Sequence, residues 1–107
     1  MSQLLDYAVD QSILVEGDLP AVQLTDEFIN VTIHYSDIDA DDVTLGLLIS
    51  SDKVNWDIIE NSEITVDTSL PRHRWDLAGF KRGSWIKPYY DAGSATDGTI
   101  DQIKYMV

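Results

Sequence analysis

Apolar and polar residues alternate along most of this chain with a period of two. The alternation is clearest at residues 27–36, and it returns at 43–50 and at 99–107. Successive side chains of a β-strand point to opposite faces, so this period predicts strands with one buried face. No segment keeps the 3.6-residue period of an amphipathic helix. The side chains expected to be buried are Ile29, Val31, Ile33 and Tyr35 in the first strand, Val43, Leu45, Leu47 and Ile49 in the second, and Ile103, Tyr105 and Val107 in the third.

Shorter apolar segments fill the rest of the chain, separated by clusters of Asp, Asn, Gly, Ser and Pro that are typical of turns. They predict further strands at residues 11–16, 56–59, 64–66, 72–77 and 84–90. Pro88 lies in the last of these and cannot donate a backbone hydrogen bond, so that strand should be bulged or at a sheet edge there. Many short strands at this spacing predict an all-β chain folded as an antiparallel β-sandwich of jelly-roll or immunoglobulin-like type.

The chain length fits one domain that spans residues 1–107. Residues 1–10 are a candidate N-terminal arm, with a frayed terminus or an edge strand as the alternatives. They contain no Lys or Arg, and their apolar residues form no long run, so they do not resemble a signal peptide. We therefore expect synthesis in a cytoplasm.

Charge and cysteine content narrow the range of functions. The formal net charge is −12, which repels phosphate backbones and anionic membrane surfaces. No apolar run approaches the ~20 residues of a membrane span. The chain has no cysteine, which removes disulfides and thiolate metal sites. We therefore expect neither nucleic acid nor a membrane as a partner.

An acidic cluster follows the first clear strand. Asp37, Asp39, Asp41 and Asp42 are spaced like the start of a calcium-binding loop, in which alternate carboxylates point at one cation. The sixth position of such a loop would be Asp42 rather than Gly, and the twelfth would be Leu48 rather than Glu. We therefore predict a solvated turn without high-affinity calcium.

Catalytic motifs are missing from the sequence. His34 lies on the polar side of a predicted strand, and His73 lies between two arginines, so both are expected at the surface. No nucleophile elbow, dinucleotide-binding loop or phosphate-binding loop occurs. Carboxylate pairs that meet only in space stay open, but no pair stands out. We expect no enzymatic activity, no cofactor and no metal.

Aromatic and basic residues concentrate in the second half of the chain. Trp56 and Trp75 are expected to pack between the sheets, although exposed aromatic rings could instead stack on sugars. Most of the basic charge falls between residues 72 and 87, and such a stripe can pair with an acidic patch on a neighbouring copy. The candidate assembly or binding surface consists of Arg72, Arg74, Arg82, Trp85, Tyr89 and Tyr90.

From residue 36 onward these features resemble a known group of proteins. An acidic turn and a strand lead into Ser51-Asp52-Lys53-Val54-Asn55-Trp56, and an aromatic strand at 85–90 precedes a glycine-containing loop at 93–98. This order is similar to small β-sandwich proteins of tailed bacteriophage particles. Two details depart from that pattern: Lys53 stands where the commoner turn has Gly, and Ala95-Thr96-Asp97-Gly98 replaces a tighter glycine loop.

The resemblance implies a structural role in the virion. It suggests a capsid decoration or head-fibre-like protein on the capsid exterior, made in the host cytoplasm. The implied partners are other copies of the chain, with a trimer as the expected state, and a major capsid or other virion protein. It supplies no catalytic residues. The alternative function is a carbohydrate-binding β-sandwich module for host attachment.

Overall fold

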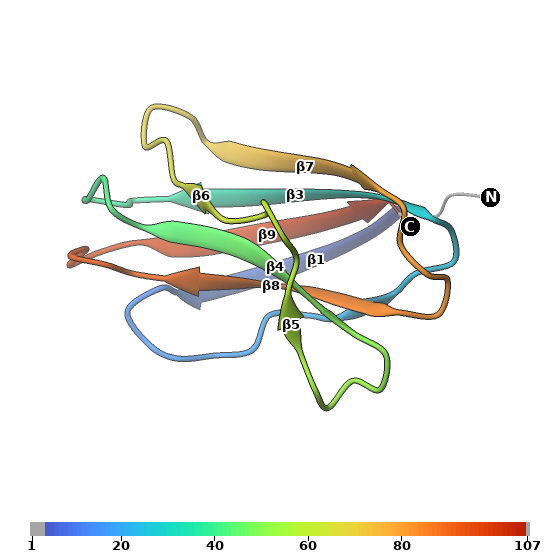
Figure 1. Ribbon diagram of the computed structural model, residues 1–107. Coiled ribbons are helices and arrows are strands. Elements are labelled where there is room, and N and C mark those ends of the chain that lie inside the picture. The colour runs from blue at the N-terminus through green and yellow to red at the C-terminus, as the bar shows by residue number, and fades with distance from the viewer. Residues whose placement is uncertain (1–3, 107) are drawn as a thin grey trace.

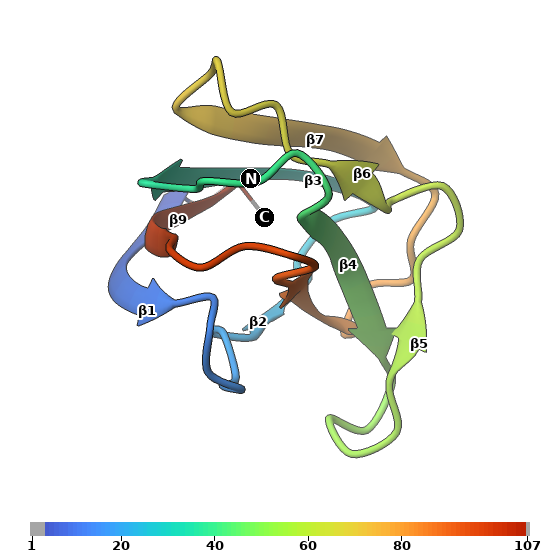
Figure 2. The same cartoon turned by 90° about the vertical axis from the view of Figure 1, so that its left-hand side faces the viewer.

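The computed structural model describes residues 4–106 as two antiparallel sheets packed face to face, which confirms the predicted β-sandwich. The first sheet has the strand order β1-β9-β3-β7, and the second has the order β2-β8-β4-β5, with β6 also paired to β4 (Figures 1 and 2). Residues 4–106 contain no helix long and apolar enough to cross a membrane. The strands are β1 (Leu4–Ser12), β2 (Val22–Gln23), β3 (Phe28–Ser36), β4 (Thr44–Ser50), β5 (Asp57–Ile58), β6 (Ile64–Thr65), β7 (Arg72–Ala78), β8 (Trp85–Asp91) and β9 (Thr99–Met106).

The core lies between the sheets and is built from the alternating residues of the long strands. The predicted inner face of β3 is buried throughout, and so are the β4 residues Leu45 and Leu47 together with Val43, which precedes the strand. Ile49 is only partly buried against this core. Tyr105 of β9 is fully buried, and its hydroxyl donates a hydrogen bond to the carbonyl oxygen of Pro20. Burial of these apolar side chains is the main contribution to stability.

A bulge in β9 changes the phase of its alternation. His34 of β3 lies opposite Gln102, but the next residue, Tyr35, lies opposite Ile100, which leaves Asp101 as the extra residue. Both Ile100 and Ile103 are therefore buried, although they are three residues apart. Simple alternation from Ile103 does not predict Ile100 in the core. Val107 falls outside the described residues.

The N-terminal segment corrects two expectations. The strand predicted at 11–16 is wrong, because β1 already ends at Ser12 and Leu14–Gly17 is irregular. Residues 4–10 of the candidate arm form most of β1, which is an edge strand. The edge-strand alternative therefore holds for them. Residues 1–3 lie outside the described residues. The arm is held because its inward residues meet the core. The ring of Tyr7 contacts Tyr105 edge to face, with centroids 5.8 Å apart.

Pro88 lies where one side of β8 has no neighbouring strand within residues 4–106, so its missing N–H costs no ladder hydrogen bond there. It pairs with Leu47 on the β4 side of β8. On the other side, β2 reaches only Trp85 and Ile86. At Pro88 the strand therefore has one hydrogen-bonded neighbour among the described residues, as the sequence predicts. The two-residue strand β2 itself was not predicted.

Candidate interaction surfaces

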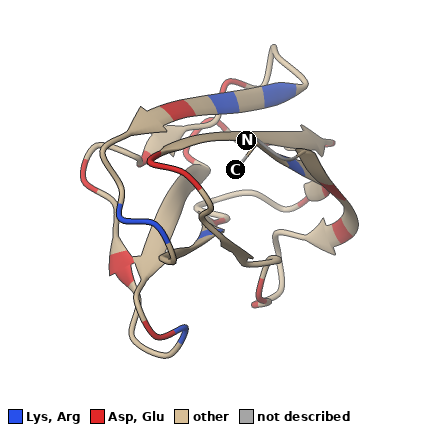
Figure 3. Cartoon of the chain, turned by 90° about the vertical axis from the view of Figure 1, so that its right-hand side faces the viewer, with Lys and Arg blue, Asp and Glu red and all other residues tan. Residues whose placement is uncertain are grey.

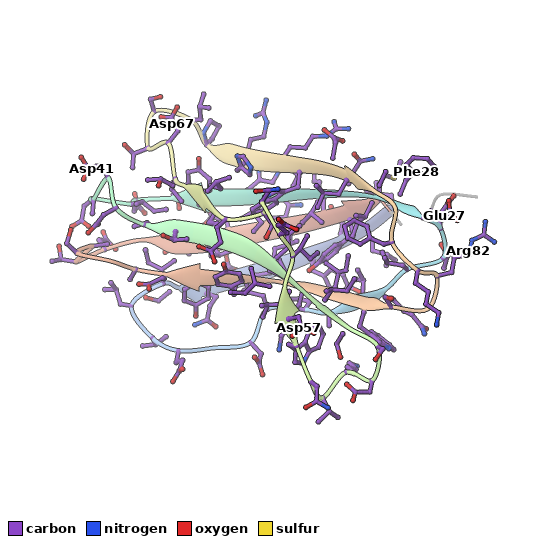
Figure 4. All side chains as sticks on the ribbon, viewed as in Figure 1. Glu27, Phe28, Asp41, Asp57, Asp67 and Arg82 are labelled. Atoms are coloured by element: carbon purple, nitrogen blue, oxygen red, sulfur yellow. The ribbon has the colours of Figure 1, made fainter. Side chains whose placement is uncertain are left out.

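The six residues predicted as one surface lie on different parts of the sandwich. Arg72 and Arg74 are exposed on β7, at the edge of the first sheet. Trp85 and Tyr89 are on the outer face of β8 in the second sheet. Tyr90 points to the opposite side of β8 and packs against the core rim, where its hydroxyl donates to the carbonyl oxygen of Val15 at 2.6 Å. Arg82 lies at the end of the molecule where Phe28 is found (Figure 4). The structure brings together Trp85 with Tyr89, and Arg72 with Arg74, but not the whole set.

The three tryptophans divide between core and surface. Trp75 is 5% exposed, and its Nε1 donates a hydrogen bond to the carbonyl oxygen of Ser62 at 2.8 Å. Its core placement is confirmed. The placement of Trp56 between the sheets is wrong, because this residue is only partly buried and the Lys87 ammonium lies 4.3 Å from its ring centroid. The reason is the shortness of β5, which begins just after Trp56 and pairs with β4 over only two residues.

The two histidines face opposite sides of the first sheet. His34 is paired with Arg72, whereas His73 is paired with Ile33, whose side chain is in the core. His73 contacts Trp75 edge to face at 4.6 Å between ring centroids. Burial lowers the pKa of both imidazoles, with the charge of Lys104 as the second cause at His34. His73 is therefore not a simple surface residue, and the two rings do not form an acid–base pair.

The outer face of the second sheet carries an aromatic and cationic strip. Along β8 it presents Trp85, Lys87 and Tyr89, and Lys53 places its ammonium 4.3 Å from the Trp85 ring centroid. The Tyr89 ring covers Gly46, where an added Cβ would lie 2.5 Å from ring atoms, so only glycine fits beneath it. Burial, with Glu63 as the second cause, raises the pKa of Tyr89.

An open groove of about 440 Å³ borders this strip. Lys87 crosses it to reach Asp18, with Nζ and Oδ1 3.3 Å apart. The groove is lined by Glu16, Gly17, Asp18, Leu19, Leu48, Lys87, Pro88, Tyr89 and Tyr90. Its polar side chains are two carboxylates, one ammonium and two phenols, and the ammonium is already paired with one of the carboxylates. The groove therefore offers charged and hydroxyl groups to a molecule bound at the surface.

The acidic cluster fastens one loop to another. Asp39 accepts hydrogen bonds from the backbone N–H groups of Thr96 and Asp97, at 2.8 and 3.1 Å, and from the Thr96 hydroxyl. Asp42 accepts from the N–H of Ser94 at 3.0 Å and from its hydroxyl at 2.9 Å. Within residues 4–106 no group of three potential ligands gathers in a metal-binding arrangement. The carboxylates therefore hold the loop between β8 and β9, and the expected lack of high-affinity calcium binding stays a prediction.

The turn between β4 and β5 is held in the same way. Asp52 Oδ1 accepts from the backbone N–H groups of Val54 and Asn55, at 2.9 and 2.8 Å. Ser50 Oγ accepts from the N–H of Lys53 at 2.8 Å. Lys53 has a φ of 66°, in the left-handed region that favours glycine. Ser50 and Asp52 together hold the backbone of the turn on both sides of Lys53.

These anchored carboxylates predict an acid-sensitive fold. Hydrogen bonds lower the pKa of all three carboxyls from an ordinary value of 3.8. The main donor is the Thr96 hydroxyl at Asp39, the Ser94 N–H at Asp42 and the Asn55 N–H at Asp52. Groups whose folded pKa is depressed stabilise the fold above the unfolded pKa and lose that effect as pH falls through the folded value. We therefore expect the urea concentration at the midpoint of unfolding to decrease as the pH drops below about 4.

A variant isolates this effect. Asp39→Asn should unfold at lower urea than wild type at pH 7, and the gap should narrow toward pH 2, where the wild-type carboxyl is protonated as well. Asp41→Asn is the control, because Asp41 is exposed and makes no side-chain hydrogen bond within residues 4–106. A gap between Asp39→Asn and wild type that stays constant from pH 7 to pH 2 would show that the ionised carboxylate is not what holds the loop.

Ser62 is a buried polar residue that sequence analysis missed. It is fully buried between β5 and β6, and its Oγ donates to the carbonyl oxygen of Ile59 at 2.7 Å. The same Oγ accepts from the N–H of Leu47 on β4 at 3.1 Å. Its carbonyl oxygen receives the Trp75 indole, so Ser62 joins both sheets. The Asn61-Ser62 break signals a turn, but nothing in the sequence marks Ser62 as a contact with Trp75.

Exposed apolar side chains gather at the end of the first sheet. Leu4 and Phe28 are each 61% exposed, and Met106 is 40% exposed. Leu4 lies directly opposite Met106, which also pairs with Asn30, two residues from Phe28 on the same face. Figure 4 shows Phe28 close to this end of the sandwich, opposite the end that carries Asp41 and Asp67. We call Leu4, Phe28 and Met106 the end patch.

No protein-family model and no curated protein matches the chain. The surfaces described above are therefore what bears on its function.

Proposed function

We propose that this chain is a structural protein of a bacteriophage particle that decorates or stabilises the capsid exterior and works by assembly rather than catalysis. The end patch carries the proposal. Large apolar side chains that cluster at the surface of a small domain mark contacts with another protein. Leu4, Phe28 and Met106 form such a cluster on the outer face of the first sheet, where another protein could cover all three.

The rest of the molecule fits an exterior position. The net charge of −12 repels packaged nucleic acid, so the protein would not be drawn into the particle interior. Hydrogen-bonded carboxylates fix its loops at Asp39, Asp42 and Asp52, which gives a compact unit with little to reorganise on binding. The proposed partners are other copies of the chain and a major capsid or other virion protein, and the proposed location is the virion.

Banded particles test this function. Particles are purified in a density gradient from a lysate of the bacterium whose phage encodes the chain, and their proteins are identified by mass spectrometry. We expect peptides of this chain in the particle band. If the chain is abundant in the soluble fraction but missing from the band, the proposed function is wrong.

The end patch itself is tested by adding protein back to particles that lack the gene. We expect wild-type protein to bind and Phe28→Asp to bind at least about tenfold more weakly, because a charge would replace an apolar side chain that the proposed contact buries. Val54→Asp is the control, since Val54 is 77% exposed in the turn between β4 and β5, on the second sheet. Equal binding by Phe28→Asp and Val54→Asp would contradict a role for the patch.

Carbohydrate binding is the second candidate, and the strip on the second sheet favours it. Trp85 lies on this strip, and Trp56 contacts Lys87, which also lines the open groove. Its support is weaker because each ring has a lysine ammonium 4.3 Å from its centroid, where a sugar would stack. A glycan array probed with wild type and with Trp85→Ala distinguishes the two: binding that is lost in the variant would favour a host-attachment module.

A further inference from the structure

The first sheet has two long edges whose backbone is not paired within residues 4–106. β1 is bonded only to β9, and β7 only to β3. Each edge therefore presents a row of free N–H and C=O groups, which can pair with another strand. β1 has nine residues and β7 has seven, long enough for a stable ladder.

The strand directions allow the two edges to join. All three pairings in this sheet are antiparallel, so β7 runs opposite to β1. If a second copy continues the sheet in the same orientation, its β1 lies antiparallel to β7 of the first copy. The sheet has an even number of strands, four, so the alternation of hydrogen-bonded and non-hydrogen-bonded pairs continues across the junction without a shift.

The register of the existing pairs shows which residues would meet. On the outer face one row runs Asp6, Lys104, Thr32 and Arg74 across the four strands. Continuing this row into the next copy places Arg74 directly opposite the Asp6 of that copy. The neighbouring rows place Arg72 opposite Ala8, and Asp76 opposite Leu4. No pair of like charges is created directly across the junction.

The charges of the two edges are complementary. β7 presents Arg72 and Arg74 on its exposed face, and Figure 3 shows two basic segments on this strand. β1 presents the exposed Asp6, which uses one carboxylate oxygen to accept from Gln102 at 2.6 Å. Arg74 is bonded to Asp76 at 2.9 Å and to Asn30 at 3.2 Å, and all three side chains are at the surface, so the guanidinium can turn to a new partner at little cost.

The inner faces of the edges are also compatible. The rows that face the core run Leu5, Tyr105, Val31 and Trp75, and Tyr7, Ile103, Ile33 and His73. Their continuation places Leu5 of the next copy beside Trp75, and Tyr7 beside His73. Leu5 and Tyr7 are half-buried in the single chain, so pairing removes further apolar area from water.

We infer that β7 of one copy pairs with β1 of the next, in the register that sets Arg74 opposite Asp6. The partner is a second copy of this chain. The contact is head to tail, so it repeats from copy to copy and closes into a ring or continues as an open chain, according to the rotation between copies. This inference rests on the proposed assembly function and specifies its self-contact. Attachment to the particle is tested separately by banding, so either can fail alone.

Charge exchange tests the register. Sedimentation velocity should show that Asp6→Arg and Arg74→Asp each weaken self-association at least about tenfold, because like charges then face each other. The double variant Asp6→Arg/Arg74→Asp should recover wild-type association, and so should an equimolar mixture of the two single variants. The control Asp57→Arg makes the same change in net charge as Asp6→Arg, but on the second sheet, and should leave association unchanged.

Other arrangements of the same strands give different results. If two copies pair through β7 alone, Arg74→Asp weakens association but Asp6→Arg does not. If neither single variant weakens association, or the double variant is weaker than both, the inferred contact is wrong. Urea midpoints close to wild type show that each variant is folded.

A disulfide gives a second, independent test. The chain has no cysteine, so Asp6→Cys/Arg74→Cys introduces the only two thiols. Within one chain these positions are three strand spacings apart, roughly 14 Å, beyond the ~7 Å reach of a disulfide. Directly opposite residues of two copies lie about 4.5–5.5 Å apart, within that reach. Mild oxidation should therefore give a ladder of covalent oligomers on a non-reducing gel. The control Asp6→Cys/Asp57→Cys should give no such ladder. If Asp6→Cys/Arg74→Cys also runs only as a monomer, the pairing is wrong.

Discussion

Replacing Trp75 with alanine should destabilise the protein by about 3–5 kcal/mol, through lost burial and the cavity left behind. The ring is 5% exposed and packs against His73, and its removal also leaves the carbonyl oxygen of Ser62 without its indole donor. Domains of this size are stable by roughly 5–15 kcal/mol, so the variant should be close to unfolding. Urea denaturation should show a midpoint lower than wild type by more than about 1 M.

Trp56→Ala is the matched control for this change. Trp56 is partly buried on the outer face of the second sheet, where its ring contacts the Lys87 ammonium. Removing it should lower the urea midpoint far less than Trp75→Ala does. If the two variants unfold at the same urea concentration, or Trp56→Ala is the less stable, the division of tryptophans between core and surface is wrong.

Ser62→Ala should be the second most damaging of these changes, with an expected cost of about 1–3 kcal/mol. The volume lost is small. The cost arises because the N–H of Leu47 would be left unpaired in a fully buried position, and the carbonyl oxygen of Ile59 would lose a 2.7 Å bond. Thermal unfolding followed by circular dichroism measures the change.

Ser51→Ala, in the loop directly after β4, provides the comparison. Ser51 is exposed, and its side chain makes no hydrogen bond within the described part of the chain, so its loss should change stability by no more than about 0.5 kcal/mol. Should Ser62→Ala melt together with Ser51→Ala, the buried hydroxyl would not be the link between the sheets that we describe.

Strand pattern and fold class followed from alternation because one face of each long strand is buried. Ile29, Val31 and Ile33 are inward in the structure as their spacing predicts. Alternation fails at the bulge in β9, where one inserted residue lets both Ile100 and Ile103 reach the core. A bulge depends on the pairing partner, so the residues of β9 alone could not reveal it.

The surfaces were harder to predict than the fold. Sequence proximity groups Arg74 with Trp85, but β7 and β8 belong to different sheets. The roles of Asp39 and Asp42 could not be predicted either, because their partners lie in a loop more than 50 positions later in the chain. The role of Ser62 likewise depends on Trp75 of β7, whose indole donates to its carbonyl oxygen. Residues whose role depends on a distant partner carry no local signal.

Sedimentation velocity of the wild-type protein, over a wide range of concentrations and at two salt levels, tests most directly whether this domain works by assembly. We expect species heavier than the 12.0 kDa chain, whose proportion rises with concentration. Their proportion should fall at high salt, because the Debye length shrinks from about 8 Å at 0.15 M salt to about 3 Å at 1 M, and exposed pairs such as Arg74 with Asp6 are then screened. A single 12.0 kDa species at every concentration and both salt levels would contradict the account.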